Sequence, residues 1–299
     1  MSTRYLITTI LLALVGLTGC QKEDSLHATL DKPKYELQLG DNPTDQFVYQ
    51  FYQDNGSYIL YDYDSLDYCW NLTRIMDLEF VKQPNKDLVL KGIQTMKKVW
   101  VDFYPAEFVK RYFPYKIMLA DTIWDSSSSI LPRHEAFCFS AINYVAFGRV
   151  HEGVEALSSD SLKTLSGLIN GIFWGQYLCK YNRVSIPQQF YQVSGEEYYN
   201  ENLQNYRTNE EVENNVKLDP RKYGFLDEIY DGLDETVNTP TYEEDVEQFV
   251  RYITSHTEEE MLAIVKDFPK LEDKYYILKA FILDTYRVDI QTIGNTVIN

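Results

Sequence analysis

The stretch SSDSLKTLSGLINGIFWGQYLCKYN, residues 158–182, decides the fold, because it predicts one long helix around which the other elements are organised. Ser158 or Ser159 can cap its start, and Asp160 places a carboxylate beside the first-turn amides, where the helix dipole favours it. Apolar side chains recur at helical spacing, so one face is expected to be core. They are Leu162, Leu165, Leu168, Ile169, Ile172 and Phe173.

Glycines follow a second line along the same predicted helix. Gly167, Gly171 and Gly175 repeat every four residues. Each glycine in a helix interior costs about 1 kcal/mol relative to alanine. We therefore expect another segment of the chain to pack closely against this strip.

The end of this helix resembles a segment of a known family. FWGQYLCKYN, followed by Pro187, Phe190 and GEEYY, is similar to the segment FHEFxHILHQ of the putative zinc-binding metallopeptidases. The resemblance is closest to their branch of substrate import-associated zinc metallohydrolase lipoproteins. It covers most of residues 33–295 and implies an α+β, zincin-like fold, with residues 158–182 as the active-site-type helix followed by C-terminal helices.

The zinc motif of that family falls on Trp174-Gly175-Gln176-Tyr177-Leu178. HExxH holds zinc with two imidazoles one helical turn apart, and its glutamate deprotonates the zinc-bound water. Here Trp174 and Leu178, which offer no lone pair, stand at the ligand positions, and Gly175 stands at the base position. We therefore expect no catalytic residue, no metal ligand and no cofactor, since the family's zinc site is lost.

A second resemblance concerns Thr241–Val250, which is similar to the acidic helix E-D-F-A-E of the family. That helix is expected to face the HExxH helix and to supply a third ligand, and Glu244 and Asp245 match it. Thr241 with Glu244 also forms a capping box, which accounts for the glutamate without a metal. Trp174, Gly175, Leu178, Glu244 and Asp245 are thus the candidate residues of a degenerate pocket.

Residues 1–20 resemble a targeting signal rather than part of a folded domain. Arg4 precedes an apolar run, Tyr5–Gly16, that is too short to span a bilayer. Leu17-Thr18-Gly19-Cys20 matches the bacterial lipobox, in which the peptidase cuts before the cysteine and the new N-terminus is acylated. We expect membrane anchoring through fatty acyl chains, such as palmitate, on Cys20.

The predicted organisation follows from this anchor. We expect a signal peptide at residues 1–19, the lipidated cysteine and a flexible tether at 20–32, and a metallopeptidase-like domain at 33–299. Gln21-Lys22-Glu23-Asp24 resembles the signal that sends certain Gram-negative lipoproteins to the outer face of the outer membrane. An ordinary charged tether is the alternative. The expected localisation is the outer membrane, facing the cell exterior.

Composition excludes one class of partner. The 299 residues carry a formal charge of −17, and such an acidic surface repels phosphate backbones, so nucleic acid is not expected to bind.

Three cysteines remain beyond Cys20, namely Cys69, Cys138 and Cys179. In an oxidising compartment this odd number leaves open one disulfide with one free thiol. For Cys179, on an apolar helix, we expect a buried free thiol.

Other segments have local signals. Ser57–Tyr63 alternates like a strand after the turn at 54–56, and its region is rich in tyrosine, for which half-buried strand aromatics are favoured over sugar stacking. Residues 87–103 predict a helix, 114–120 a strand, and 136–150 a strand pair or one bent strand.

His134-Glu135-Ala136-Phe137-Cys138 spells H-E-x-x-C, a spacing that could hold zinc on a helix. On a strand, its two ends lie about 13 Å apart, too far for one ion.

These observations predict a catalytically inactive outer-membrane lipoprotein that works with a nutrient or glycan importer, the partner that the resemblance implies. Two alternatives stay open. One is an active zinc metallopeptidase whose metal site uses other residues. The other is a glycan- or peptide-binding module whose old cleft is lined by Trp174 and Tyr177. We expect Trp174 and Leu178 to fill the former metal cavity, since exposed aromatic surface in an empty cleft is uncommon.

Overall fold

The computed structural model describes residues 34–37, 39–69, 77–126 and 132–298 of the chain. The predicted signal peptide, Cys20 and the charged segment after it lie outside the described residues. The chain divides into two units, Met1–Leu37 and Gln38–Asn299, and every element below belongs to the second. Within the described ranges, no helix combines the length and the apolar character needed to cross a bilayer.

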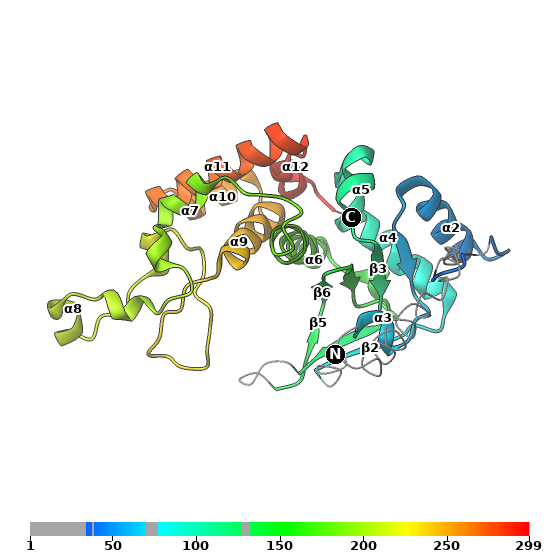
Figure 1. Cartoon of the computed structure of the whole chain (residues 1–299), viewed down its shortest axis with the longest axis horizontal. Helices are drawn as coiled ribbons and strands as arrows, with labels where there is room; N and C mark the ends of the chain where they lie inside the picture. The colour runs from blue at the N-terminus through cyan, green and yellow to red at the C-terminus, as the bar shows by residue number, and fades with distance from the viewer. Residues whose placement is uncertain (1–33, 38, 70–76, 127–131, 299) are drawn as a thin grey trace, which may run out of the picture. The chain divides into compact units, whose positions relative to one another are not determined.

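A four-stranded sheet forms the first layer of the fold (Figure 1). Its order is β1-β3-β7-β6, with β1, β3 and β7 parallel and β6 antiparallel to β7. Every residue of β3 and β7 is buried, as expected for parallel strands covered on both faces. The strands are β1 (Tyr58–Leu60), β3 (Lys116–Leu119), β6 (Cys138–Ala141) and β7 (Tyr144–Phe147).

A smaller antiparallel sheet has the order β2-β4-β5. Its strands are β2 (Leu78–Val81), β4 (Thr122–Asp125) and β5 (His134–Ala136). The strand predicted at 114–120 and the strand pair predicted within 136–150 are confirmed by β3, β6 and β7. His134 and Cys138 of the H-E-x-x-C sequence lie in strands and not on one helix face, as predicted, but they belong to two successive strands instead of one.

The tyrosine-rich N-terminal region differs from the prediction. A helix, α2 (Pro43–Asn55), occupies most of it, and Gly56 ends this helix with φ 73°. Asn42 caps α2 through its side chain, and Pro43 fits the first helical position. The strand that follows is only β1, and it pairs in parallel with the distant β3.

Further helices precede the strands of the smaller sheet, lie between β2 and β4, or follow β5 along the chain. The helix predicted at 87–103 is confirmed as α4 with the short η2. Both α2 and α4 contact the larger sheet. The elements are α3 (Ser65–Tyr68), α4 (Lys86–Val99), η2 (Val101–Phe103), α5 (Ala106–Tyr112) and η3 (Val154–Ala156).

The long central helix is confirmed, in two parts. It begins as α6 (Ser159–Ile172), capped by Ser158, whose side chain accepts from the amide of Ser161. It continues without interruption as a π-helix, η4 (Phe173–Cys179). The π-helical part contains all five positions that align with HExxH. Wide turns of this kind are rare and often lie at functional sites.

The glycine strip has the neighbour that the sequence predicts. A helix, α9 (Tyr242–Ser255), runs along α6 and η4 (Figure 1). A Cβ atom at Gly167 would lie 2.8 Å from the carbonyl oxygen of Arg251, and one at Gly171 would lie 2.8 Å from that of Glu247. The glycines therefore allow two helix backbones to approach more closely than side chains would permit.

The polar region between residues 183 and 240 is mostly irregular, with short helices, and more helices follow α9. The α+β class with C-terminal helices is thereby confirmed. The remaining elements are α7 (Gln188–Ser194), η5 (Glu196–Tyr198), η6 (Leu203–Tyr206), α8 (Asn209–Glu213), η7 (Pro220–Tyr223), α10 (Glu258–Val265), α11 (Pro269–Tyr286) and α12 (Ile290–Asn295).

Candidate functional site

Trp174, at the first ligand position of the lost motif, is a core residue. Its side chain is 0% exposed and packs against the rings of Phe108 and Tyr286, with centroids 5.7 and 5.6 Å away. The indole Nε1 donates to the hydroxyl of Tyr104 at 2.9 Å, and that hydroxyl donates to Oδ1 of Asn170 at 2.6 Å. The polar edge of the ring is therefore satisfied inside the protein.

Leu178 and Tyr177 are also 0% exposed. The expectation that Trp174 and Leu178 fill the former metal cavity agrees with this burial. The alternative of an open cleft lined by Trp174 and Tyr177 is wrong, because neither side chain reaches the surface. A ligand that binds this protein must use another part of it.

Gly175, at the position of the general base, lies directly against α9. A Cβ atom there would lie 2.5 Å from the carbonyl oxygen of Glu243 and 2.6 Å from Cβ of Glu247. These are backbone or backbone-attached atoms, which cannot turn aside. The position therefore has no room for a glutamate side chain while α9 is in place.

A zinc ion does not fit the residues at this position. Trp174 and Leu178 provide no donor atom, and the nearest carboxylate of α9, Glu247, accepts a hydrogen bond from Nε2 of Gln176 at 2.8 Å. Burial raises the pKa of Glu247, although this hydrogen bond acts in the opposite direction. Across the described ranges, no group of three or more His, Cys, Asp and Glu side chains is arranged to hold a metal ion.

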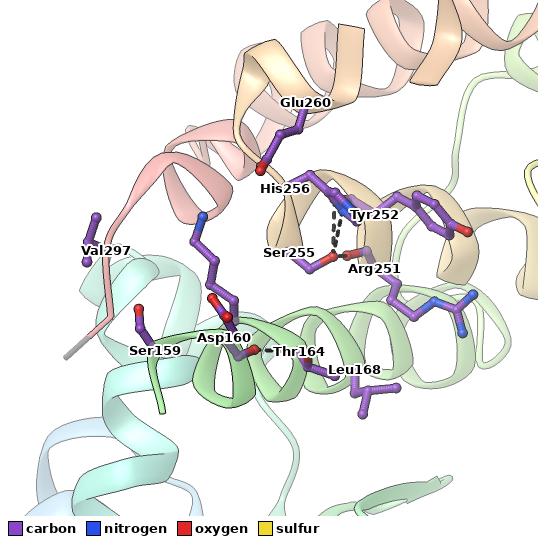
Figure 2. Close-up of a pocket in the computed structure, with 11 residues that line it drawn as sticks. Ser159, Asp160, Thr164, Leu168, Arg251, Tyr252, Ser255, His256, Glu260 and Val297 are labelled. Carbon is purple, nitrogen blue, oxygen red and sulfur yellow. Dashed lines mark hydrogen bonds between the residues drawn. The ribbon is translucent and has the colours of Figure 1, made fainter. Parts of the chain in front are cut away.

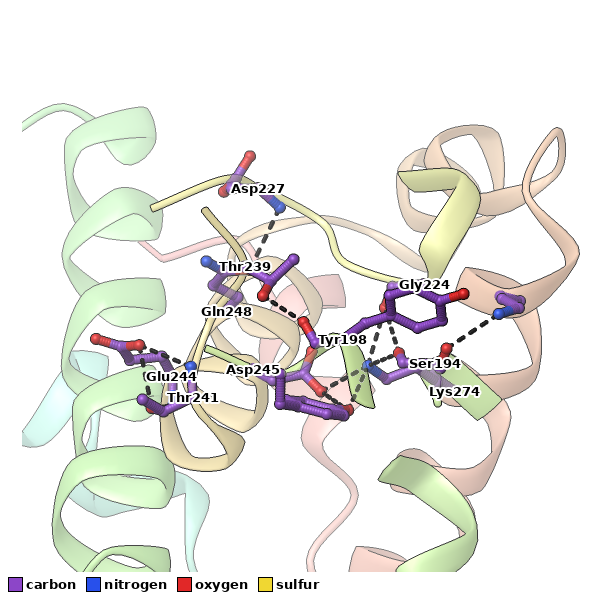
Figure 3. Close-up of polar contacts among 12 residues, drawn as sticks. Ser194, Tyr198, Gly224, Asp227, Thr239, Thr241, Glu244, Asp245, Gln248 and Lys274 are labelled. Carbon is purple, nitrogen blue, oxygen red and sulfur yellow. Dashed lines mark hydrogen bonds and ion pairs between the residues drawn. The ribbon is translucent and has the colours of Figure 1, made fainter. Parts of the chain in front are cut away.

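Glu244 is used by the helix itself (Figure 3). Its Oε2 accepts from the amide of Thr241 at 2.9 Å and from the hydroxyl of Thr241 at 3.0 Å, so the capping box predicted from the sequence is confirmed. Thr257 and Glu260 form a second capping box at the start of α10.

Asp245 faces the opposite side of α9 from η4, toward α11 (Figure 3). The carboxylate is 0% exposed and accepts from Nζ of Lys274 at 2.5 Å and from the hydroxyl of Tyr199 at 2.6 Å. Lys274 also donates to the hydroxyl of Ser194 at 3.0 Å and to the carbonyl of Gly224 at 2.9 Å. Asp245 therefore does not join Trp174, Gly175 and Leu178 in one pocket.

Burial governs the protonation of this buried pair. It lowers the pKa of Lys274 to about 8, although the carboxylate of Asp245 acts in the opposite direction. It also raises the pKa of Asp245, against the favourable effects of Lys274 and Tyr199. Four aromatic rings surround Nζ at 4.4–5.6 Å, which explains the strength of the desolvation. The group is inaccessible to a substrate and has a structural role.

The sequence analysis missed Lys274, although a signal was present. Lys274 falls in register with Leu271 and Leu278, two positions three and four residues away that face the core. A lysine in a core register must find a buried acceptor, because an unpaired buried charge is costly. The partner could not be read from the sequence, since Asp245 lies 29 residues away and Ser194 lies 80 residues away.

Cys69, Cys138 and Cys179 are free thiols in this structure. Cys69 and Cys138 are buried, while Cys179 is only partly buried. Burial raises the pKa of the Cys179 thiol, which keeps it protonated. A disulfide is not formed among these residues, so the free thiol expected at Cys179 is confirmed, whereas its expected full burial is not.

The largest pocket among those described lies between the start of α6, the end of α9 and the start of α10 (Figure 2). Its volume is about 630 Å³. Its charged lining side chains have both signs and are Asp160, Lys163, Arg251 and Glu260. Arg251 is already paired, since it donates to Asp227 at 2.7 Å. This mixture selects neither a cation nor an anion.

A second pocket, which we call the α7 pocket, lies between the end of η4, α7 and the start of α9. Its volume is about 350 Å³, and its lining includes Cys179, Asn182, Tyr191, Glu196, Tyr242 and Glu243. This pocket adjoins the degenerate motif at Cys179 and lies next to Glu243, the residue whose carbonyl oxygen contacts Gly175.

No model of a protein family matches the sequence, and no curated protein matches it. The chain is similar to a crystal structure described as a putative zinc-binding metallo-peptidase from Bacteroides caccae ATCC 43185. The match has 14% sequence identity and a TM-score of 0.49, and covers 84% of this chain and 88% of that chain. A likeness of this degree says nothing about zinc binding here.

Proposed function

We propose that this chain is a non-catalytic, lipid-anchored protein with a metallopeptidase-like fold. The observation that carries the proposal is the packing at the degenerate motif. Trp174 and Leu178 are core residues, and the backbone of α9 occupies the space that a base at position 175 would need. A zinc hydrolase needs three protein ligands and an open coordination position for water, and this part of the chain offers neither.

Zinc content and hydrolysis test the proposal. Purified protein should carry well under one equivalent of zinc by elemental analysis, and should show no peptidase activity against a mixture of unstructured peptides. The reason is the missing donor set rather than weak affinity. One equivalent of zinc, removed by a chelator together with a peptidase activity, would favour the alternative of an active metallopeptidase whose ligands lie elsewhere.

The location of the protein is part of the proposal. The lipobox at Leu17–Cys20 supports an acylated Cys20, and the charged residues after it support the outer face of the outer membrane. Cys20→Ala should abolish metabolic fatty-acid labelling and release the protein from membranes. Unchanged labelling in that variant would refute the anchor, and full protection from protease in intact cells would refute surface exposure.

The function at the membrane is proposed to be binding, beside components of a nutrient importer. The family resemblance supports the importer, and the two pockets beside α9 support binding. In the alternative of a glycan- or peptide-binding module, the ligand would therefore bind in these pockets and not at the buried Trp174 and Tyr177. Co-purification of importer proteins with the anchored chain tests the partnership, and their absence after gentle extraction would contradict it.

A further inference from the structure

All the charged side chains that line the α7 pocket are negative. Two carboxylates, Glu196 and Glu243, belong to it, and no lysine, arginine or histidine does. The carbonyl end of η4 and the amide end of α9 both border the pocket, so their opposite dipole charges offset each other. The carboxylates therefore determine the local potential, and it favours a cation.

Hydrogen-bonding groups in this pocket are free to receive a ligand. Glu243 makes no side-chain hydrogen bond to another described residue, and neither do Tyr191 and Asn182. Glu196 uses only Oε1, which accepts from Nε2 of Gln188 at 2.9 Å. The lining thus contains several oxygen atoms that can accept from a donor on the ligand.

Aromatic and aliphatic side chains form the remaining wall. The rings of Tyr191 and Tyr242 meet edge to face with centroids 4.7 Å apart, and Tyr242 is 39% exposed. Val184 and Ile186 complete this apolar side. Tyrosine rings attract cations through their faces, and an apolar wall accepts the hydrocarbon part of a ligand.

A metal ion does not match these features. No arrangement of three or more metal-ligating side chains exists in the described ranges, although Cys179, Glu196 and Glu243 line the same pocket. A quaternary ammonium has no N–H to donate and would leave the carboxylates without hydrogen bonds. A primary ammonium donates three hydrogen bonds and keeps its charge, so it satisfies both the acceptors and the potential.

We infer that the α7 pocket binds a small organic molecule through a primary ammonium group, with the ammonium at Glu196 and Glu243 and the hydrocarbon part against Tyr191 and Tyr242. The volume of about 350 Å³ is at the lower end of the range of small-molecule sites, about 300–1,000 Å³. The inference does not depend on whether the chain is catalytic, because it uses none of the motif positions.

Calorimetry of the purified protein at about 0.15 M salt tests this site, with n-butylammonium as the probe. The uncharged analogue n-butanol and the quaternary analogue butyltrimethylammonium are the comparisons. We expect saturable binding of n-butylammonium and weaker binding of both analogues. Glu196→Gln and Glu243→Gln should each weaken it by about 10- to 100-fold, the range for a lost charge-assisted hydrogen bond.

Glu259→Gln is the matched control. Glu243 and Glu259 both occupy the second position of a helix, in α9 and α10, but only Glu243 lines the pocket. The control should bind n-butylammonium like the parent protein. No saturable binding in the millimolar range, unchanged binding in both pocket variants, or an equal loss in the control would each overturn the inference.

A further comparison distinguishes two sources of the ammonium. Ala-Ala-amide carries the amino terminus of a peptide, and acetylated Ala-Ala-amide lacks the charge. Tighter binding of Ala-Ala-amide than of n-butylammonium, lost on acetylation, identifies a peptide amino terminus. Tighter binding of n-butylammonium than of Ala-Ala-amide identifies a free amine.

Discussion

Replacement of Trp174 by alanine is the most direct test of the packing at the degenerate motif. The side chain is 0% exposed, and its ring contacts those of Phe108 and Tyr286. Truncation of a fully buried tryptophan leaves a cavity and typically costs about 3–5 kcal/mol. The loss also removes the donor to Tyr104, whose own hydroxyl still donates to Asn170.

Trp174→Phe separates these two contributions. Phenylalanine keeps most of the ring but loses the indole donor, so it should cost about 1–2 kcal/mol, the range for a buried acceptor left without its partner. Urea unfolding followed by far-ultraviolet circular dichroism measures both variants without relying on the fluorescence of the removed ring. An unchanged slope with a lowered midpoint shows a change in stability alone.

Tyr276→Ala is the control for the removal of aromatic surface. Tyr276 lies on α11 and is 48% exposed, so its removal should change the free energy of unfolding by less than about 0.5 kcal/mol. If Trp174→Ala melts with the midpoint of the parent protein, the filled-cavity account is wrong. If Trp174→Phe lowers the free energy of unfolding as much as Trp174→Ala does, the hydrogen bond rather than the cavity determines the loss of stability.

Two further predictions concern α9. Gly175→Ala should lower the free energy of unfolding, because overpacking against the Glu243 carbonyl, typically about 1–3 kcal/mol, exceeds the gain of about 1 kcal/mol in helix propensity; a higher urea midpoint would contradict the close approach of the helices. Lys274→Met should cost about 3–5 kcal/mol because it leaves Asp245 buried without its charge partner, and adding Asp245→Asn should recover much of that loss. Additive losses in the double variant, measured by denaturant melts, would show that the two side chains do not form a coupled pair.

Local patterns were sufficient for the helices that position the site. The spacing of the apolar residues and glycines in 158–182 predicts both α6 and the close approach of α9, because both follow from the geometry of one cylinder. Thr241 and Glu244 likewise predict the start of α9, since a capping box lies within four residues.

Tertiary pairing accounts for what the sequence did not show. The tyrosines of α2 were attributed to a strand, although Asn42 and Pro43 carry a helix-start signal that was overlooked. The π-helical turns of η4 have no recognised local pattern in this chain. The partner of Lys274 and the lining of the α7 pocket depend on segments brought together only by folding, so no window of sequence contains them.

The approach of α9 to the glycine strip also limits how this sequence can change over generations. A glutamate at position 175 displaces α9, and a histidine at position 174 gives up core contacts, so each step toward HExxH loses stability by itself. Zinc binding adds no stability until its ligands are present together. Intermediates with one or two of the changes are therefore less stable than the present chain and no better at binding metal. Selection that acts on one substitution at a time therefore has no favourable path to the motif.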